Sequence, residues 1–514
     1  MPQFRKNKVV YSLIFGALLI VLIVFPFSID YDFEIEEWEK HKEKYFWDWI
    51  GQTTAGLASS EATADGRPFT WKSRDRMDRE QMEFRYVDDG RIPFISVTDV
   101  DSETDMYGGI NAVGFSLENT DAHNFPLNNP PENGWGRGMD DGQIHRLALA
   151  TCRTVDDFAA ILDSLNYMGR TYNYTWRTFD AFGGAALFET AAYEYYRYDA
   201  IDEPYGILVR SNYALAGPDP GPDNQRFGLH RHDRSEELFK DAAVRGILCP
   251  QYIIDVVCRD ITTLLLDPYP LPFDGYDGDL PFGLVNNSAS VGRWSTRAVL
   301  VAHGVRPYED PLETVLWAMV GSPISGVATP LWVRAGSVPR EYVGPPFSRL
   351  SNRMIQLRSW VYSVDARGVD TWKLTNPDNT GLWDFIYPLQ DWVFRKTEQF
   401  VNSDEFSYEH LEAFQNEIAQ QVADSLDNWR PQTITVNEVA TPYFWNNQLH
   451  LRWGELTEGV FRNIDDVEYV IERSPYPFRN NEIGEEVAVV RGTSWVDEDP
   501  PAGRSFYRIK ARTL

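Results

Sequence analysis

Cysteine is scarce in this sequence. The 514 residues include only three, Cys152, Cys249 and Cys258, and their spacing fits neither a zinc-binding pattern nor a disulfide framework. An odd number leaves at least one cysteine unpaired, and we expect these thiols to be buried as small apolar side chains. The sequence therefore predicts neither a disulfide scaffold nor a cysteine nucleophile.

Basic side chains are also in short supply. Lys and Arg together number 48 against 76 Asp and Glu, which gives a formal net charge of -28. This balance argues against nucleic acid as a partner, because phosphates require Lys- and Arg-rich surfaces, and against broad docking on anionic lipid. Among the eight histidines, His230 and His232 alternate as they would on one face of a strand. No carboxylate-rich ligand pattern accompanies them, so we expect no metal site there.

Long apolar runs are absent except at the amino end. Basic residues in segment 1–8 precede the uncharged run 9–28, which is about long enough to cross a bilayer. Basic residues on the short side predict that this side stays in the cytoplasm. No small-residue cleavage site follows, so we interpret 9–28 as a transmembrane signal anchor; a cleaved secretory signal is the alternative. Alternating acids and bases at helical spacing predict an exposed juxtamembrane spacer over 29–52. The remaining chain is then periplasmic or extracellular.

The body of the chain, 53–430, alternates short strand patterns with helical ones. Strands are predicted around 94–100, 109–120, 183–189, 193–198, 206–215 and 298–303. Helical periodicity covers 142–167, with Thr154 as an N-cap, and returns at 234–265 and 384–428. Blocks of this kind predict an α+β fold in which stacked sheets are covered by helices.

The character changes near residue 431. Regularly spaced strand patterns separated by turn residues predict a small all-β sandwich over 431–514. Its tryptophan, its Tyr469-Val-Ile-Glu-Arg473 strand and its last strand resemble a fibronectin type III domain. We see no reaction centre in it.

The chemistry is predicted at the start of the body. Residues from Thr53 to Asp75 read as a strand, an Asp65-Gly66 turn and a second strand. If the peptide bond before Thr53 is cut, one residue carries both a hydroxyl nucleophile and an α-amine. The amine, with an ordinary pKa of about 7.7–8.0, can act as the general base for the hydroxyl. Without the cut, the segment is an ordinary hairpin.

Several segments between residues 53 and 360 resemble the linear amide C–N hydrolases. This N-terminal-nucleophile group includes penicillin V acylase, bile-salt hydrolase and isopenicillin N acyltransferase. The segments occur in the order expected for the group: Ala62–Asp75, Gly109-Ile-Asn111-Ala-Val-Gly-Phe-Ser-Leu-Glu-Asn119, Phe182–Glu189, Val209-Arg-Ser-Asn212 and Arg293-Trp-Ser-Thr296. The resemblance implies a four-layer αββα sandwich over 53–430.

The resemblance also implies roles for individual residues. The nucleophile falls at Thr53 or its neighbour Thr54, where members of the group have cysteine; other N-terminal-nucleophile hydrolases, such as proteasome β-subunits, use threonine. Arg74 is expected to hold the reacting residue and orient a substrate carboxylate, and Asp75 to anchor the α-amine. Asn119, or alternatively Asn111 or a backbone N–H, is expected to stabilise the oxyanion. The two remaining matches to the family site are Asn212 and Arg293. Ser73 departs from the group's asparagine.

Three functions stay open at this point. The first is a membrane-anchored hydrolase or acyltransferase that acts on small acyl amides, is freed by cleavage between Gln52 and Thr53, and uses no cofactor. The second is a catalytically inactive relative that serves as a membrane-tethered binding or scaffold protein. The third is a structural β-rich surface protein.

Overall fold

The computed structural model describes residues 53–76, 81–100, 102, 104–125, 138–219, 227–262, 284–344, 348–362, 368–375, 379–403 and 406–430 of the body, and 433–435, 443–445, 448–453, 467–474, 484–501 and 505–513 beyond it. The predicted segments 1–8, 9–28 and 29–52 lie outside these residues. Within the described part of the chain, the helices are too short or too polar to cross a membrane.

A six-stranded sheet carries Thr53 at the start of one of its interior strands. Its strands lie in the order β10-β1-β2-β12-β13-β14. Their bounds are Ile207–Arg210, Thr53–Ala58, Phe69–Asp75, Thr296–His303, Val315–Val320 and Thr329–Leu331. β1 pairs antiparallel with β10 on one side and with β2 on the other, and β2 pairs with β12. Every residue of β1 is buried. Its first residue, Thr53, pairs with Arg74 of β2, whereas pairing with β10 begins two residues later, at Ala55.

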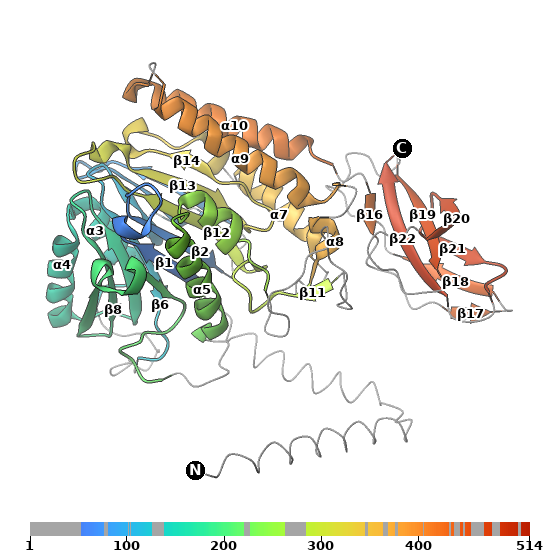
Figure 1. The fold of residues 1–514 in the computed structure, drawn as a ribbon, viewed down its shortest axis with the longest axis horizontal. Coiled ribbons are helices and arrows are strands. Elements are labelled where there is room, and N and C mark those ends of the chain that lie inside the picture. Colours follow the sequence, from blue (N-terminus) through green and yellow to red (C-terminus); the bar gives the residue numbers. More distant parts are fainter. Residues whose placement is uncertain are drawn as a thin grey trace, which may run out of the picture. The chain divides into compact units, whose positions relative to one another are not determined.

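A seven-stranded sheet follows the chain in simple sequence order from β3 to β9. The bounds of its strands are Met82–Val87, Phe94–Asp99, Met106–Asn111, Ser116–Asp121, Tyr174–Phe179, Ala185–Thr190 and Tyr195–Asp199. Strands β1 and β2 contact β6, and β12 and β13 contact β5, so the two sheets lie face to face (Figure 1).

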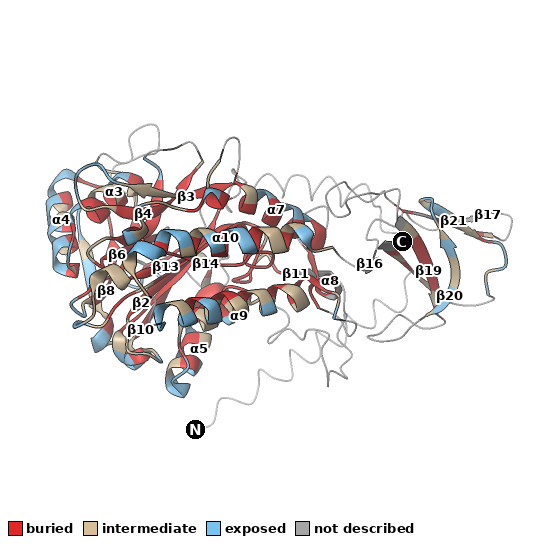
Figure 2. Cartoon of the chain, turned by 90° about the horizontal axis from the view of Figure 1, so that it is seen from above, coloured by how far each residue is buried: buried red, intermediate tan, exposed pale blue. Residues whose placement is uncertain are grey.

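Helices cover the outer face of each sheet. α3 (Asp141–Thr151) packs on β5 and β6, and its apolar side chains share one core with those of α4 (Val155–Met168) and of the seven-stranded sheet. On the other side, α5 (Leu229–Arg245) packs on β10, α7 (Arg349–Val361) on β13 and α10 (Leu411–Asn428) on β14. Figure 2 shows buried and exposed faces on α4, α9 (Leu382–Val401) and α10, as expected for amphipathic covering helices. The body is thus an α+β unit of two central sheets between helices.

Shorter elements complete the described body. They are η2 Ser60–Ala62, η3 Ala200–Asp202, η4 Pro204–Gly206, α6 Pro250–Tyr252, η6 Ile253–Val257, β11 Leu284–Asn286, η7 Pro311–Glu313, η8 Val333–Ala335, η9 Arg340–Tyr342, β15 Gly368–Asp370, α8 Thr371–Leu374 and η10 Tyr408–His410. β11 pairs antiparallel with β15.

Two antiparallel sheets make up the carboxyl-terminal segment. One has the order β16-β22-β19-β20 and the other the order β17-β18-β21. Their bounds are Thr433–Thr435, Phe506–Thr513, Val467–Ser474 and Glu485–Val490 for the first sheet, and Tyr443–Trp445, Gln448–Arg452 and Ser494–Asp497 for the second. The described residues beyond 430 form strands and loops, as predicted, whereas the bounds 431–514, the sandwich arrangement and the resemblance to fibronectin type III stay predictions.

The predictions agree with the structure where they depend on interactions between residues that are close in the sequence. Thr154 caps α4 by accepting from the backbone of Asp157, whose side chain returns the bond. The predicted hairpin is present as β1 and β2, although residues 59–68 between them also include η2. One strand prediction was wrong: 109–120 forms the end of β5 and all of β6. They are separated by a turn in which Gly114 has a φ of 79°, a conformation that side chains disfavour.

Candidate active site

The first residue of β1 lies directly opposite Arg74 of β2. Because directly opposite residues of antiparallel strands point to the same face, Thr53 and Arg74 share one face of the sheet. Successive residues alternate, so Thr54 and its partner Ser73 point to the other face. The two threonines between which the sequence could not decide therefore lie in different surroundings.

The backbone of Thr53 is held at both of its polar atoms. Its nitrogen donates to Oδ1 of Asn212 at 2.8 Å, and its carbonyl accepts from Nη1 of Arg231 at 2.9 Å. Nη2 of Arg231 donates to the same Asn212 oxygen at 3.0 Å, and Nη1 also bonds the hydroxyl of Thr54. Burial, and then the charge of Arg293, lower the pKa of Arg231, while Asp75 opposes them. Asn212 and Arg231 thus fix the position of the Thr53 backbone.

Arg74 stacks on an aromatic ring. Its guanidinium lies 3.6 Å from the ring centre of Tyr107 in β5, and the residue as a whole is 7% exposed. The ring is itself fixed, since the Tyr107 hydroxyl donates to Asp99 at 2.9 Å and accepts from Arg76 at 3.1 Å. Among the described residues, the Arg74 guanidinium has neither an ion pair nor a hydrogen bond, and its Nε is fully enclosed. Burying a cation without an anionic partner is costly, because no ion pair offsets its desolvation.

Asp75 lies on the opposite face of β2, and its carboxylate is bonded within the protein. Arg293, which precedes β12, donates to Asp75 Oδ2 through Nε at 3.1 Å and through Nη2, and Thr296 donates its hydroxyl to Oδ1 at 2.7 Å. The pairing of Asp75 with Arg293 joins two of the predicted site residues. In the uncut chain the nitrogen of Thr53 is bonded to Asn212, whereas Asp75 is engaged by Arg293 and Thr296.

Asn119 of β6 lies on the facing sheet and is linked to β2 through Lys72. The Lys72 ammonium donates to Asn119 Oδ1 at 2.7 Å and to the carbonyl of Tyr107 at 2.6 Å. Nδ2 of Asn119 donates to Asp141 Oδ2 at 3.1 Å, at the start of α3. Beside Lys72, burial raises the pKa of Glu118 to about 8, against the opposing charges of Lys72 and Arg177.

Asn111, the alternative candidate for the oxyanion donor, uses its side-chain amide within the protein. Its Nδ2 donates to the carbonyls of Leu149 and Cys152 at the end of α3, and its Oδ1 accepts from Val113 and Phe115 in the turn after β5. Both amide hydrogens therefore have backbone acceptors. Asn111 closes a turn against a helix end, and it has no N–H left for a substrate.

Three contributors were missed in the sequence: Arg231, Lys72 and Tyr107. The prediction that His230 and His232 alternate on a strand face is wrong, because both lie in α5, and the arginine between them is the residue that contacts Thr53. Lys72 alternates with Thr70 and Arg74 in the strand pattern of Phe69–Asp75, where a polar residue is expected, so the sequence carried no distinct signal for its burial. Tyr107 carried no signal distinct from other strand aromatics.

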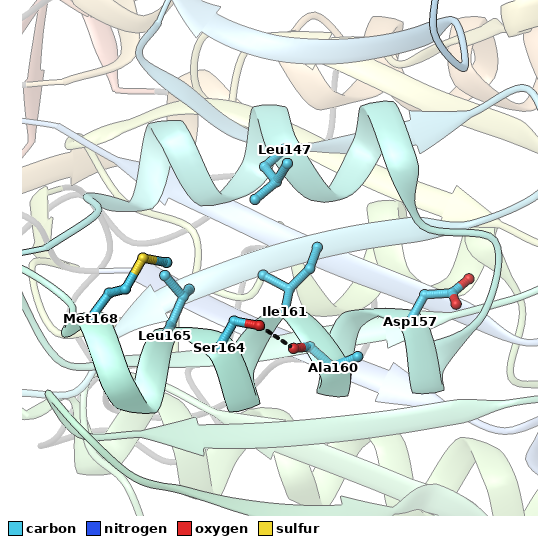
Figure 3. A pocket seen from close by; sticks show the side chains of 7 residues that line it. All are labelled: Leu147, Asp157, Ala160, Ile161, Ser164, Leu165 and Met168. Carbon is cyan, nitrogen blue, oxygen red and sulfur yellow. Dashed lines mark hydrogen bonds between the residues drawn. The ribbon is translucent and has the colours of Figure 1, made fainter.

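Other chemistry is not assembled in the described part of the chain. No cluster of His, Cys, Asp or Glu there could hold a metal ion. Cys152 and Cys258 are buried, as expected, whereas Cys249 is only partly buried. Burial raises the pKa of the Cys152 and Cys258 thiols to about 12. A hollow of about 240 Å³ lies between α3 and α4, on the outer helical layer (Figure 3). Its lining consists of Leu147, Asp157, Ala160, Ile161, Ser164, Leu165 and Met168. None of these is a predicted site residue.

Comparisons with known proteins give distant structural similarity. The penicillin V acylase from Agrobacterium tumefaciens matches with a TM-score of 0.32 and 12% identity, covering 55% of this chain and 86% of that one. Two variants of the conjugated bile acid hydrolase from Clostridium perfringens match with TM-scores of 0.32 and 0.34 and identities of 11% and 10%. They cover 52% and 54% of this chain, and 89% and 92% of their own length. No family model and no curated protein matches the sequence.

Proposed function

We propose that this protein is a hydrolase or acyltransferase of the N-terminal-nucleophile type that acts on linear amide C–N bonds, with Thr53 as its nucleophile. One observation carries the proposal. Thr53 opens a central strand with its nitrogen on the buried Oδ1 of Asn212, and its side chain shares a face with a buried arginine that has no anionic partner among the described residues.

The proposed reaction begins with cleavage between Gln52 and Thr53. The Thr53 hydroxyl attacks the Gln52 carbonyl, the C–N bond breaks as the acyl group moves to oxygen, and water hydrolyses the resulting ester. Another protease would give the same product. The new α-amine remains beside Asn212, which accepts one of its hydrogens, and the nearby Arg231 charge favours its neutral, basic form.

Turnover then follows from the freed residue. The amine takes the hydroxyl proton as Oγ attacks the substrate carbonyl, and it passes that proton to the leaving amine when the C–N bond breaks. Asn119 donates to the oxyanion, and Arg74 binds a carboxylate of the substrate. Water, or a second amine, attacks the acyl ester and regenerates Thr53. The mechanism needs no cofactor.

The location of the protein belongs to the same proposal. With 9–28 as a signal anchor, the body is exported and tethered to the membrane on the extracytoplasmic side. Cleavage before Thr53 would separate the body from this anchor unless the two pieces stay associated.

A second function has one observation in its favour. Thr53 is only 1% exposed in the uncut chain, so no substrate can reach it before processing. A chain that is never cut would serve as a catalytically inactive, membrane-tethered binding protein.

The two neighbouring threonines give a matched test. We expect Thr53→Ala to abolish both processing and hydrolysis of a chromogenic acyl amide. Thr54→Val should retain most activity and lose about 1 kcal/mol of unfolding free energy, because it removes the bond from Arg231. Mass spectrometry, steady-state kinetics and denaturant unfolding measure these effects. Full turnover in Thr53→Ala, or loss of activity only in Thr54→Val, contradicts the assignment.

A further inference from the structure

Lys72 occupies a position that a lysine rarely takes. It lies in the middle of β2 with no exposed surface, between the two sheets. The next residue of β2 on the same face is Arg74, and Arg74 lies opposite Thr53. Burial, and then the charge of Arg74, hold the pKa of Lys72 well below its ordinary value. A methionine would fill this space without such a desolvation cost, so the amine needs a specific purpose.

The amine of Lys72 fills a gap in the facing sheet. Pairing between β5 and β6 ends at Gly108 and Glu118. The next residues along these strands are Tyr107 and Asn119, and Lys72 donates to the backbone carbonyl of the first and to the side-chain oxygen of the second. Even a neutral amine carries the two hydrogens that these bonds require. Lys72 therefore joins β2 to the end of the β5–β6 ladder.

These contacts determine which way the Asn119 amide faces. A lysine amine donates its hydrogens here, so the atom of Asn119 that it meets must be the oxygen. The NH₂ group is then turned to Asp141 Oδ2, at 3.1 Å, which accepts one of its two hydrogens. The amide of Asn119 is held between a donor on one side and an acceptor on the other, and one N–H remains for another acceptor.

We propose that Lys72 is a positioning residue: it holds Oδ1 of Asn119 so that the remaining N–H of this amide meets the oxyanion formed when Thr53 attacks a substrate. The inference rests on the proposed function and adds a residue to it. Lys72 does not touch the substrate, and its effect passes through Asn119. Removing it therefore changes the chemical step, provided that Asn119 is present.

A double-mutant cycle tests this dependence. Asn119→Ala should lower kcat about 100- to 1,000-fold, the usual effect of losing one oxyanion donor. Lys72→Met should lower kcat at least about 10-fold with KM changed by less than about 2-fold, because the donor is misplaced only in the transition state. In the Asn119→Ala background, Lys72→Met should have no further effect on kcat.

A second buried lysine is the matched control. Lys373 of α8 is 8% exposed, donates to the carbonyl of Trp360 at 2.8 Å, and has its pKa lowered by burial. Lys373→Met should leave kcat unchanged, although it also removes a buried amine. Circular dichroism and thermal unfolding monitor folding in each variant. If Lys72→Met does not fold, Asp141→Ala tests the same amide from its acceptor side, with a fall in kcat of about 3-fold that disappears in Asn119→Ala.

The outcomes separate the two proposals. An inactive, processed wild type or an active Thr53→Ala overturns the proposed function, and the inference falls with it. An active wild type whose kcat is unchanged in Lys72→Met overturns the inference alone. Equal losses from Lys72→Met with and without Asn119 also overturn it, because Lys72 would then act independently of that amide.

Discussion

The arginines at the two ends of the β1–β2 hairpin have different partners. At the turn end, Arg67 binds Glu309 with both Nε and Nη2, at 2.7 and 2.8 Å, and Arg306 shares the same carboxylate. At the Thr53 end, the Arg74 guanidinium stacks on Tyr107 and has no carboxylate among the described residues. Because the chain carries 76 acidic residues, carboxylates are plentiful. The cations at the turn end are paired within the protein and support the fold, whereas under the proposed function the unpaired Arg74 is the one left to bind a substrate carboxylate.

The largest expected difference between the two ends is in activity. Arg74→Met should lower kcat/KM for a carboxylate-bearing acyl amide about 10- to 100-fold, because a charged hydrogen-bonded contact contributes about 1.5–3 kcal/mol. Its stability should stay the same or rise, because a buried unpaired charge is removed. Arg67→Met is the control, with unchanged kcat/KM and about 1–2 kcal/mol less unfolding free energy. Equal activity losses in both variants would show that Arg74 has no special role.

The second prediction concerns how the unfolding free energy changes with pH through Glu118, near the Thr53 end of the hairpin. The pKa of Glu118 is raised to about 8, so the folded protein keeps a proton that the unfolded chain releases near pH 4. Its stabilising contribution is complete at low pH and is lost as pH rises through about 8. Glu118→Gln should therefore gain stability relative to the wild type between pH 5 and pH 9. Parallel unfolding curves across this range would show that Glu118 has an ordinary pKa.

The third and smallest effect, at the turn end, has the opposite pH dependence: unfolding free energy is lost as pH falls. Although burial raises the pKa of Asp65, bonding to His303 and Arg67 lowers it below its ordinary value overall. Its contribution is present above the unfolded pKa, near pH 4, and is lost as pH falls further. Asp65→Asn should be less stable than the wild type at pH 6, and the difference should shrink below pH 4. A difference that is independent of pH would remove the ionic explanation.

Local features of the fold could be predicted from the sequence, whereas features that depend on long-range contacts could not. The Thr154 cap and the Asp65-Gly66 turn were predictable because each depends on residues within a few positions. The break at Gly114 was missed because 109–120 reads as one continuous strand, and only the turn closed by Asn111 shows otherwise. Where hydrophobic periodicity is strong, the type of secondary structure in the body was predicted correctly from the sequence.

The site shows the limit of sequence interpretation more clearly. Thr53, Arg74 and Asp75 share one hairpin, so their proximity follows from register alone. Arg231 lies 178 positions from Thr53, and Lys72 reaches Asn119 from another sheet. Such contacts depend on how sheets stack and where a helix begins, and no local pattern encodes them. Arg231 and Lys72 both stand among other polar residues in the sequence, so their burial could not be predicted from it.

The central claim is that the chain is cut before Thr53, and the amino terminus of the native protein tests it most directly. Intact-mass measurement combined with amino-terminal sequencing, on protein isolated from its own cells, reads that terminus. The account predicts a body that begins with Thr53 and a Thr53→Ala variant that stays whole. A native protein with an unbroken Gln52–Thr53 bond, or one that begins at Thr54, would contradict it.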